Sequence, residues 1–273
     1  MMKNSPLLSR RNMLKLTSGS LLTVPFMGLQ GCNFPFSAGK AHAAVFDTLA
    51  PSKPQWASGG TSAITDIPYS NPLLDDPLGN LCRLVEPMTK GPCYSTTQVR
   101  QDISEGRDGL PMRLWFKIVD ERCQPVAGAN VDIWHCDPYG IYSGDDMRSV
   151  NFCTTGNKAA QAHDWFRGVQ TTDENGLVYF ESCFPGWYVM RAVHIHLIIS
   201  KEQQSVTTQV GFDDALVGSI TMNEAIYYDR GAPAISNITD SVFPHNGDVS
   251  YFMETEQLAD KTMLAWKTFA VGF

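Results

Sequence analysis

Two histidines separated by one residue are the sequence feature with the clearest chemical meaning. His194 and His196 precede the apolar run Leu197-Ile198-Ile199, which is typical of a strand. Side chains at positions i and i+2 of a strand point to the same face, so both imidazoles can reach one metal ion. On a helix they would diverge by about 200°. A pair of half-buried, hydrogen-bonded histidines is the alternative that this spacing leaves open.

Tyrosines in two short segments change the chemistry that such a pair could support. One segment contains Tyr139 and Tyr142, and the other places Tyr188 shortly before the histidines. A phenol has a pKa of about 10, so it binds a metal as phenolate only when the metal is a strong Lewis acid. Hard anionic oxygens suit Fe(III) better than Zn(II) or Cu(I). Two tyrosines with two histidines therefore favour a ferric centre.

Short apolar runs separated by turn signals must position these side chains. In residues 112–119, Arg113 and Lys117 alternate with Leu114, Phe116 and Ile118, as on a half-buried strand. Similar runs predict strands at 130–134, 177–181, 189–200 and 205–212, with turns rich in Gly, Pro, Asp and Asn between them. The expected fold is all-β, a sandwich of mostly antiparallel strands with long active-site loops.

Composition narrows the possible partners. The 273 residues are 43% hydrophobic and 18% charged, as in ordinary globular proteins. The net charge of −7 argues against a nucleic-acid partner, because clustered Lys and Arg drive phosphate binding. After the N-terminus, no apolar run is long enough to span a bilayer. The oligomeric state is left open.

The N-terminal residues resemble an export signal. Arg10-Arg11 followed by an apolar stretch resembles a Tat signal, and Leu29-Gln30-Gly31-Cys32 resembles a lipobox. We expect residues 1–31 to be a signal peptide, 32–79 a flexible Pro/Gly/Ser-containing linker and 80–273 the catalytic domain. A lipid on Cys32 would be the only membrane attachment of a periplasmic or cell-envelope protein. Cleavage after the Ala-rich residues 41–44 is the alternative.

Cysteine usage agrees with export. Apart from Cys32, six cysteines remain, and an even number in an oxidising compartment predicts up to three disulfides. The sequence does not choose among the pairings; Cys136 is expected in one of them, and buried free thiols are the alternative. The six are Cys82, Cys93, Cys123, Cys136, Cys153 and Cys183.

From Cys82 onward the chain resembles the intradiol ring-cleavage dioxygenases, in particular the secreted branch related to the protocatechuate 3,4-dioxygenase β-subunit. The resemblance covers about 190 residues and has no counterpart of the helical dimerisation region of catechol 1,2-dioxygenases. The similar segments are Gly91-Pro92-Cys93-Tyr94, residues 166–173, Pro185-Gly186-Trp187-Tyr188 and residues 191–196. The spacing between residues 131–133 and Gly140-Ile141-Tyr142 is also similar to that of the family.

The resemblance implies specific roles. Tyr142, Tyr188, His194 and His196 would be the Fe(III) ligands, with Tyr142 preferred to Tyr139 because it follows Gly140 at the family's spacing. Tyr188 would also be the ligand that substrate displaces. Arg191 would lie beside the substrate ring, where a cation stabilises developing negative charge, and Gln209 would lie near the iron. His135 would be a supporting or hydrogen-bonded residue, and His42, His163 and His245 would be exposed.

The implied reaction is cleavage of a catechol-type ring between its two hydroxyl-bearing carbons, with O2, to a cis,cis-muconate. Two other interpretations come from different classes. A sandwich of this fold could be a non-catalytic envelope module that binds an aromatic ligand or a partner protein. A zinc enzyme could use His194, His196 and a carboxylate, which would leave both tyrosines without a role.

Overall fold

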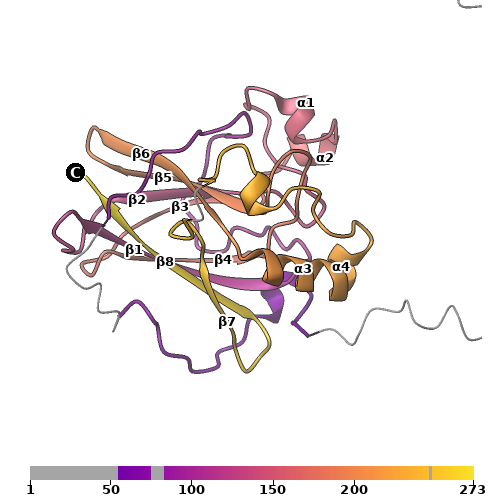
Figure 1. The fold of residues 1–273 in the computed structure, drawn as a ribbon, viewed down its shortest axis with the longest axis horizontal. Coiled ribbons are helices and arrows are strands. Elements are labelled where there is room, and N and C mark those ends of the chain that lie inside the picture. The colour runs from indigo at the N-terminus through magenta and orange to yellow at the C-terminus, as the bar shows by residue number, and fades with distance from the viewer. Residues whose placement is uncertain (1–54, 75–82, 246–247) are drawn as a thin grey trace, which may run out of the picture. The chain divides into compact units, whose positions relative to one another are not determined.

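Two four-stranded sheets pack face to face around an apolar core (Figure 1). The computed structural model describes residues 55–74, 83–245 and 248–273. One sheet has the order β4-β1-β8-β7 and contains β1 (Pro111–Asp120), β4 (Leu177–Cys183), β7 (Glu254–Gln257) and β8 (Met263–Val271). The other has the order β3-β2-β5-β6 and contains β2 (Asn130–Trp134), β3 (Arg167–Thr171), β5 (His194–Lys201) and β6 (Gln204–Gly211).

The pairing of strands is antiparallel except between β1 and β8, which run parallel. The predicted all-β sandwich of mostly antiparallel strands is confirmed. The β5 strand begins at His194 and not at Val189 as predicted, because Met190 adopts a left-handed conformation (φ 71°) that interrupts an extended chain. The central strand β8 had no predicted counterpart.

Side chains along β2 and β5 alternate between an inner face, in the core, and an outer face, which carries the candidate site residues. Val131 and Ile133 of β2, and Ile195 and Leu197 of β5, are fully buried in the core between the sheets. Since successive side chains of a strand point to opposite faces, Asp132, Trp134, His194 and His196 occupy the outer face of the same sheet. Long loops bury this outer face, which is why both histidines are only 2% exposed.

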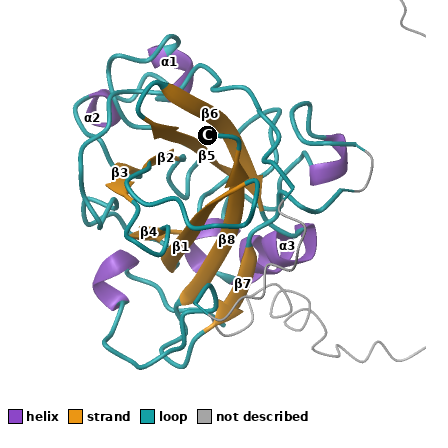
Figure 2. Cartoon of the chain, turned by 90° about the vertical axis from the view of Figure 1, so that its left-hand side faces the viewer, coloured by secondary structure: helices purple, strands orange, loops and turns teal. Residues whose placement is uncertain are grey.

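Helices are short and lie outside the two sheets (Figure 2). The longest is α3 (Asp214–Asn223), and it is followed by α4 (Ala225–Tyr228). The loop between β2 and β3 contains α1 (Val150–Cys153) and α2 (Lys158–Gln161), and the single turns η1 (Gly60–Ala63) and η2 (Asn237–Thr239) complete the elements. Within the part of the chain that is described, no helix has the length and apolarity needed to cross a membrane.

The described part of the predicted linker is attached to the sandwich. In residues 55–74, Leu73 is 1% exposed, and its carbonyl accepts a hydrogen bond from Lys117 Nζ at 2.8 Å. Tyr69 accepts one from the indole of Trp115 at 3.1 Å. Trp115 and Lys117 both belong to β1, so residues 55–74 are attached to this strand. These contacts contradict the prediction of a flexible linker for residues 55–74. The predicted signal peptide and Cys32 lie outside the described residues, and those predictions stay predictions.

Candidate metal centre

His194 and His196 project from β5 with their imidazoles directed at one point. Their Nε2 atoms lie 3.0 Å apart. The Nδ1–H of His194 donates to the carbonyl of Ala192 at 2.6 Å, which leaves the Nε2 lone pair of His194 facing the centre. The ring of His196 is fixed by stacking on Trp134, with ring centroids 4.8 Å apart and planes 7° apart. The two Nε2 atoms are therefore held together in a buried site.

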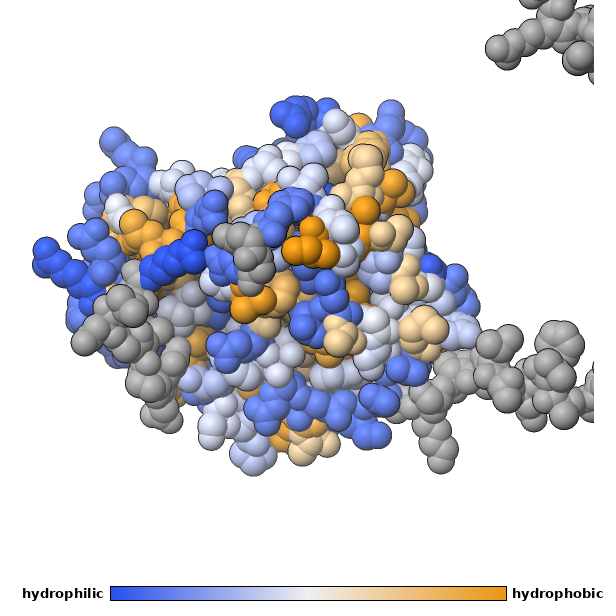
Figure 3. Space-filling view, viewed as in Figure 1, coloured by the Kyte–Doolittle hydropathy of each residue, from blue (hydrophilic) through white to orange (hydrophobic). Residues whose placement is uncertain are grey.

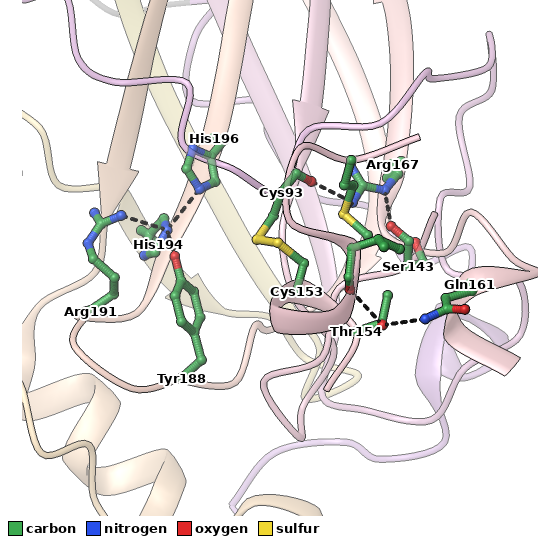
Figure 4. The surroundings of a disulfide bond; sticks show 12 residues. Cys93, Ser143, Cys153, Thr154, Gln161, Arg167, Tyr188, Arg191, His194 and His196 are labelled. Carbon is green, nitrogen blue, oxygen red and sulfur yellow. Dashed lines mark hydrogen bonds between the residues drawn. A yellow bond between two sulfur atoms is a disulfide. The ribbon is translucent and has the colours of Figure 1, made fainter. Parts of the chain in front are cut away.

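Two loops bring the tyrosines to the same point. Tyr188, between β4 and β5, places its hydroxyl 3.2 Å from His194 Nε2 (Figure 4). Tyr142, in the loop after β2, packs its ring 5.5 Å from that of Tyr188 and 6.2 Å from that of His196, measured between centroids. Its hydroxyl is buried and has no hydrogen-bond partner among the described residues. The four residues that the resemblance nominated thus converge.

Gly140 allows the two tyrosine loops to touch. Its φ of +78° is one that other residues rarely adopt, and a Cβ at this position would lie 2.1 Å from the carbonyl oxygen of Trp187. The backbone of the Tyr142 loop can therefore pack directly against the backbone that precedes Tyr188. The Gly-x-Tyr spacing in the sequence has this steric origin.

Burial determines the protonation states of the four side chains. It lowers the pKa of His194 to about 3, with Arg191 adding to the shift, and it lowers the pKa of His196 well below the usual value. Both imidazoles are therefore neutral, as a metal requires. Burial also raises the pKa of Tyr188 to about 12 and that of Tyr142 well above the usual value. Only a strong positive charge at the centre would convert both to phenolates.

Arg191 also reaches the histidines of the centre. Its Nη1 lies 3.4 Å from His194 Nε2, and its Nη2 donates to Gln209 Oε1 at 2.5 Å. Gln209 lies opposite His196 on the neighbouring strand and donates to the carbonyl of Thr89 at 2.7 Å. Arg191 Nε donates to the carboxylate of Asp240 at 2.9 Å. The structure therefore brings Arg191 and Gln209 together beside the histidines.

Asp240 is a residue that sequence reasoning missed. It is fully buried and also accepts hydrogen bonds from the backbone amides of Ala192, Val242 and Phe243. Burial raises its pKa, but the bonds from Arg191 and the Ala192 amide outweigh burial and hold the pKa below its usual value. No motif surrounds Asp240 in the sequence, so only the fold reveals that it anchors Arg191.

A disulfide supports the Tyr142 loop. Cys93 and Cys153 are bonded, and the backbone N–H of Tyr142 donates to the carbonyl of Cys153 at 2.9 Å. Figure 4 shows the disulfide between the His194 side of the site and Arg167. Arg167 is fully buried and donates to the carbonyls of Ser143 and Cys93 at 2.7 Å each. The loop that precedes β1 is thereby joined to the loop that carries Tyr142.

Other sequence expectations have mixed outcomes. Cys136 and Cys183 are free and buried, so the predicted place of Cys136 in a disulfide is wrong, and the alternative of buried free thiols applies to both. Cys136 instead lies against the carbonyl of Gly186.

His135 is buried and hydrogen-bonded to Ser182 at 2.8 Å, away from the centre's ligands. Tyr139 is half exposed and lines a separate hollow. His163 and His245 are exposed, and His42 lies outside the described residues.

The donor set fits a hard, highly charged metal ion. Two neutral imidazoles and two phenol oxygens converge, and the unpartnered hydroxyl of Tyr142 is satisfied if it binds such an ion. Among the described residues no group of three His, Cys, Asp or Glu side chains could hold a metal. A zinc site made of His194, His196 and a carboxylate is therefore not supported.

Comparison with known proteins agrees with this arrangement. Residues 88–226, just over half of the chain, match the sequence model of a dioxygenase family. The solved intradiol ring-cleavage dioxygenase of Tetranychus urticae is 26% identical, with a TM-score of 0.60 over 70% of this chain and 95% of that one. A second solved dioxygenase is 27% identical, with a TM-score of 0.59 and the same coverage.

A more distant structure shares the fold alone. The dioxygenase domain of a carbohydrate-binding fusion from Streptomyces sp. SirexAA-E is 20% identical, with a TM-score of 0.51 over 70% of this chain and 99% of that one. No curated protein matches the chain. The family match over half of the chain, the sandwich and the convergent tyrosines and histidines lead to one conclusion: the chain belongs to the intradiol ring-cleavage dioxygenase family.

Proposed function

We propose that the protein is a non-haem Fe(III) dioxygenase that uses O2 to cleave a catechol-type ring between its hydroxyl-bearing carbons, giving a cis,cis-muconate. Tyr142, Tyr188, His194 and His196 would hold the iron. The observation that carries the proposal is the convergence of these four uncharged donors, with the hydroxyl of Tyr142 buried and unpartnered. When bound, Fe(III) would act as a Lewis acid that binds both catechol oxygens and activates the ring toward O2.

Each side chain of the centre would have a separate role in the proposed reaction. His194 and His196 stay neutral because burial lowers both pKa values, so they remain donors across the physiological range. The pKa of Tyr188 is raised to about 12, so its phenolate oxygen would take a proton from a catechol hydroxyl and hold it at neutral pH. Arg191 would place its charge beside the ring, where negative charge develops. Gln209 and Asp240 would keep that guanidinium in place.

We also propose that the enzyme works outside the cytoplasm, exported by the Tat pathway and held by a lipid on Cys32. The Cys93–Cys153 bond supports export, because such bonds persist in oxidising compartments. The half-exposed apolar residues near the site, such as Phe152, suit a small aromatic substrate that diffuses in from the envelope.

A visible absorption spectrum of the protein purified without chelator tests the function. A tyrosinate-to-Fe(III) charge-transfer band that moves to longer wavelength on anaerobic addition of catechol is the expected result. Tyr142→Phe should weaken or abolish the band. Tyr139→Phe is the matched control, because Tyr139 lies in the same loop but outside the centre, and it should leave the band unchanged. A protein that stays colourless after Fe(III) is supplied would instead favour a non-catalytic binding module.

A further inference from the structure

A small cavity opens beside the two tyrosines of the candidate centre. Its volume is about 140 Å³, below the roughly 300–1,000 Å³ typical of sites for drug-sized ligands. Besides Tyr142 and Tyr188, its wall contains the Cys93–Cys153 disulfide, Phe152 and Val189. None of the residues that line it is charged. The space therefore suits a single aromatic ring with a small substituent.

Two apolar side chains of the cavity wall are exposed to solvent. The ring of Phe152 lies 6.5 Å from that of Tyr188, yet Phe152 is 50% exposed. Val189, next to Tyr188, is 67% exposed. Apolar side chains gather over α1, the helix that contains Phe152, among more polar surroundings (Figure 3). A ligand entering here would bury apolar surface on both sides.

The described cations around the site are already engaged. Arg191 is paired with Asp240, and Arg167 donates to the backbone carbonyls of Ser143 and Cys93. Arg230 donates to the carbonyl of Trp187 and stacks on its ring, with 4.3 Å between the guanidinium carbon and the ring centroid. A carboxylate in the cavity would lose its hydration without gaining an ion pair.

We propose, on the basis of the function proposed above, that this cavity selects uncharged catechols with a small apolar substituent and rejects catechols that carry a carboxylate. The discrimination comes from the uncharged wall made by Phe152, Val189 and the disulfide. The chain's net charge of −7 acts in the same direction by repelling anions during approach.

The test compares 4-methylcatechol with 3,4-dihydroxybenzoate, which differ only in a methyl group against a carboxylate at one ring position. For the iron-loaded protein we expect kcat/KM to favour 4-methylcatechol by about 100-fold or more, the cost of desolvating an unpaired carboxylate. Calorimetric titration of the metal-free protein with 4-methylphenol and 4-hydroxybenzoate should show the same order of affinity. Equal values, or a preference for the carboxylates, would overturn the proposal.

A pair of variants isolates the charge of the wall. Phe152→Lys introduces a cation at the entrance, and Phe152→Met is the neutral control of similar length. The lysine variant should move the kcat/KM ratio about tenfold toward 3,4-dihydroxybenzoate, as expected for a partly exposed charge pair. The methionine variant should leave the ratio unchanged. If both variants move the ratio alike, size and not charge sets the selection, and the proposal fails. If neither catechol is cleaved by any form, the dioxygenase function fails, and the phenol titrations still decide the preference of the cavity.

Discussion

Replacing Asp240 by Asn removes the charge that holds Arg191 while keeping the shape of the side chain. The carboxylate is fully buried and accepts hydrogen bonds from Arg191 Nε at 2.9 Å and from the amide of Ala192 at 2.7 Å. Its second oxygen accepts from the amides of Val242 and Phe243. Whichever way the Asn amide is turned, its NH2 group faces N–H donors, so one pair of these bonds is lost.

The expected magnitude follows from burial. Breaking a buried ion pair by removing one partner costs about 3–5 kcal/mol. Arg191 keeps its bond to Gln209 Oε1, so we expect the lower end, about 3 kcal/mol at pH 7. Under the proposed function, a displaced guanidinium should also reduce kcat by about 10- to 100-fold.

Urea unfolding at several pH values is the assay. Arg83→Gln is the control, because Arg83 is 68% exposed in its pair with Asp248, and it should cost no more than about 1 kcal/mol. Since the pKa of Asp240 is lowered in the folded state, its stabilising contribution is present above the unfolded pKa of about 4 and is lost as pH falls through the folded value. The difference between wild type and Asp240→Asn should therefore shrink below about pH 4.

Two outcomes would refute this reasoning. One is an Asp240→Asn variant that is no less stable at pH 7 than Arg83→Gln. The other is a stability difference from wild type that stays constant between pH 7 and pH 3, because an uncharged role for Asp240 would not titrate.

Two further predictions concern the Tyr142 loop. Replacing both Cys93 and Cys153 by Ala should lower the free energy of unfolding by about 2–4 kcal/mol, since the disulfide links residues 60 apart in the sequence. Equal urea midpoints for this variant and the wild type would contradict this prediction. Gly140→Ala should cost more than about 2 kcal/mol and, under the proposed function, weaken iron binding, because a Cβ there meets the carbonyl of Trp187. Gly128→Ala, at a glycine of similar φ with open space around it, is the control, and the same loss of iron in both would show that backbone strain and not the contact is responsible.

Local patterns predicted the strands that carry the site. The alternation of Ile195 and Leu197 with His194 and His196 is a property of neighbouring residues, so the sequence was enough to place both imidazoles on one face. The resemblance to the dioxygenase family added Tyr142 and Tyr188, which the structure brings to the same point. The roles of all four side chains remain part of the proposal.

Local patterns did not predict which distant strands or cysteines would pair. The β8 strand pairs in parallel with β1 about 150 residues earlier in the chain, and nothing in either segment indicates that partner. Cys153 is bonded to Cys93, whereas Cys136 is free although it lies in the same part of the sequence. The choice depends on which thiols the fold brings within bonding distance.

By itself the sequence indicated the strands that carry the site, the candidate donor residues and the family resemblance, because periodicity and motif spacing act over a few residues. Only the tertiary structure decided which groups control those donors. Asp240 reaches Arg191 across 49 residues, and Gly140 contacts Trp187 between two separate loops. Such contacts arise when the sheets and loops pack, since the burial that shifts pKa values and joins distant charges is a property of the whole fold.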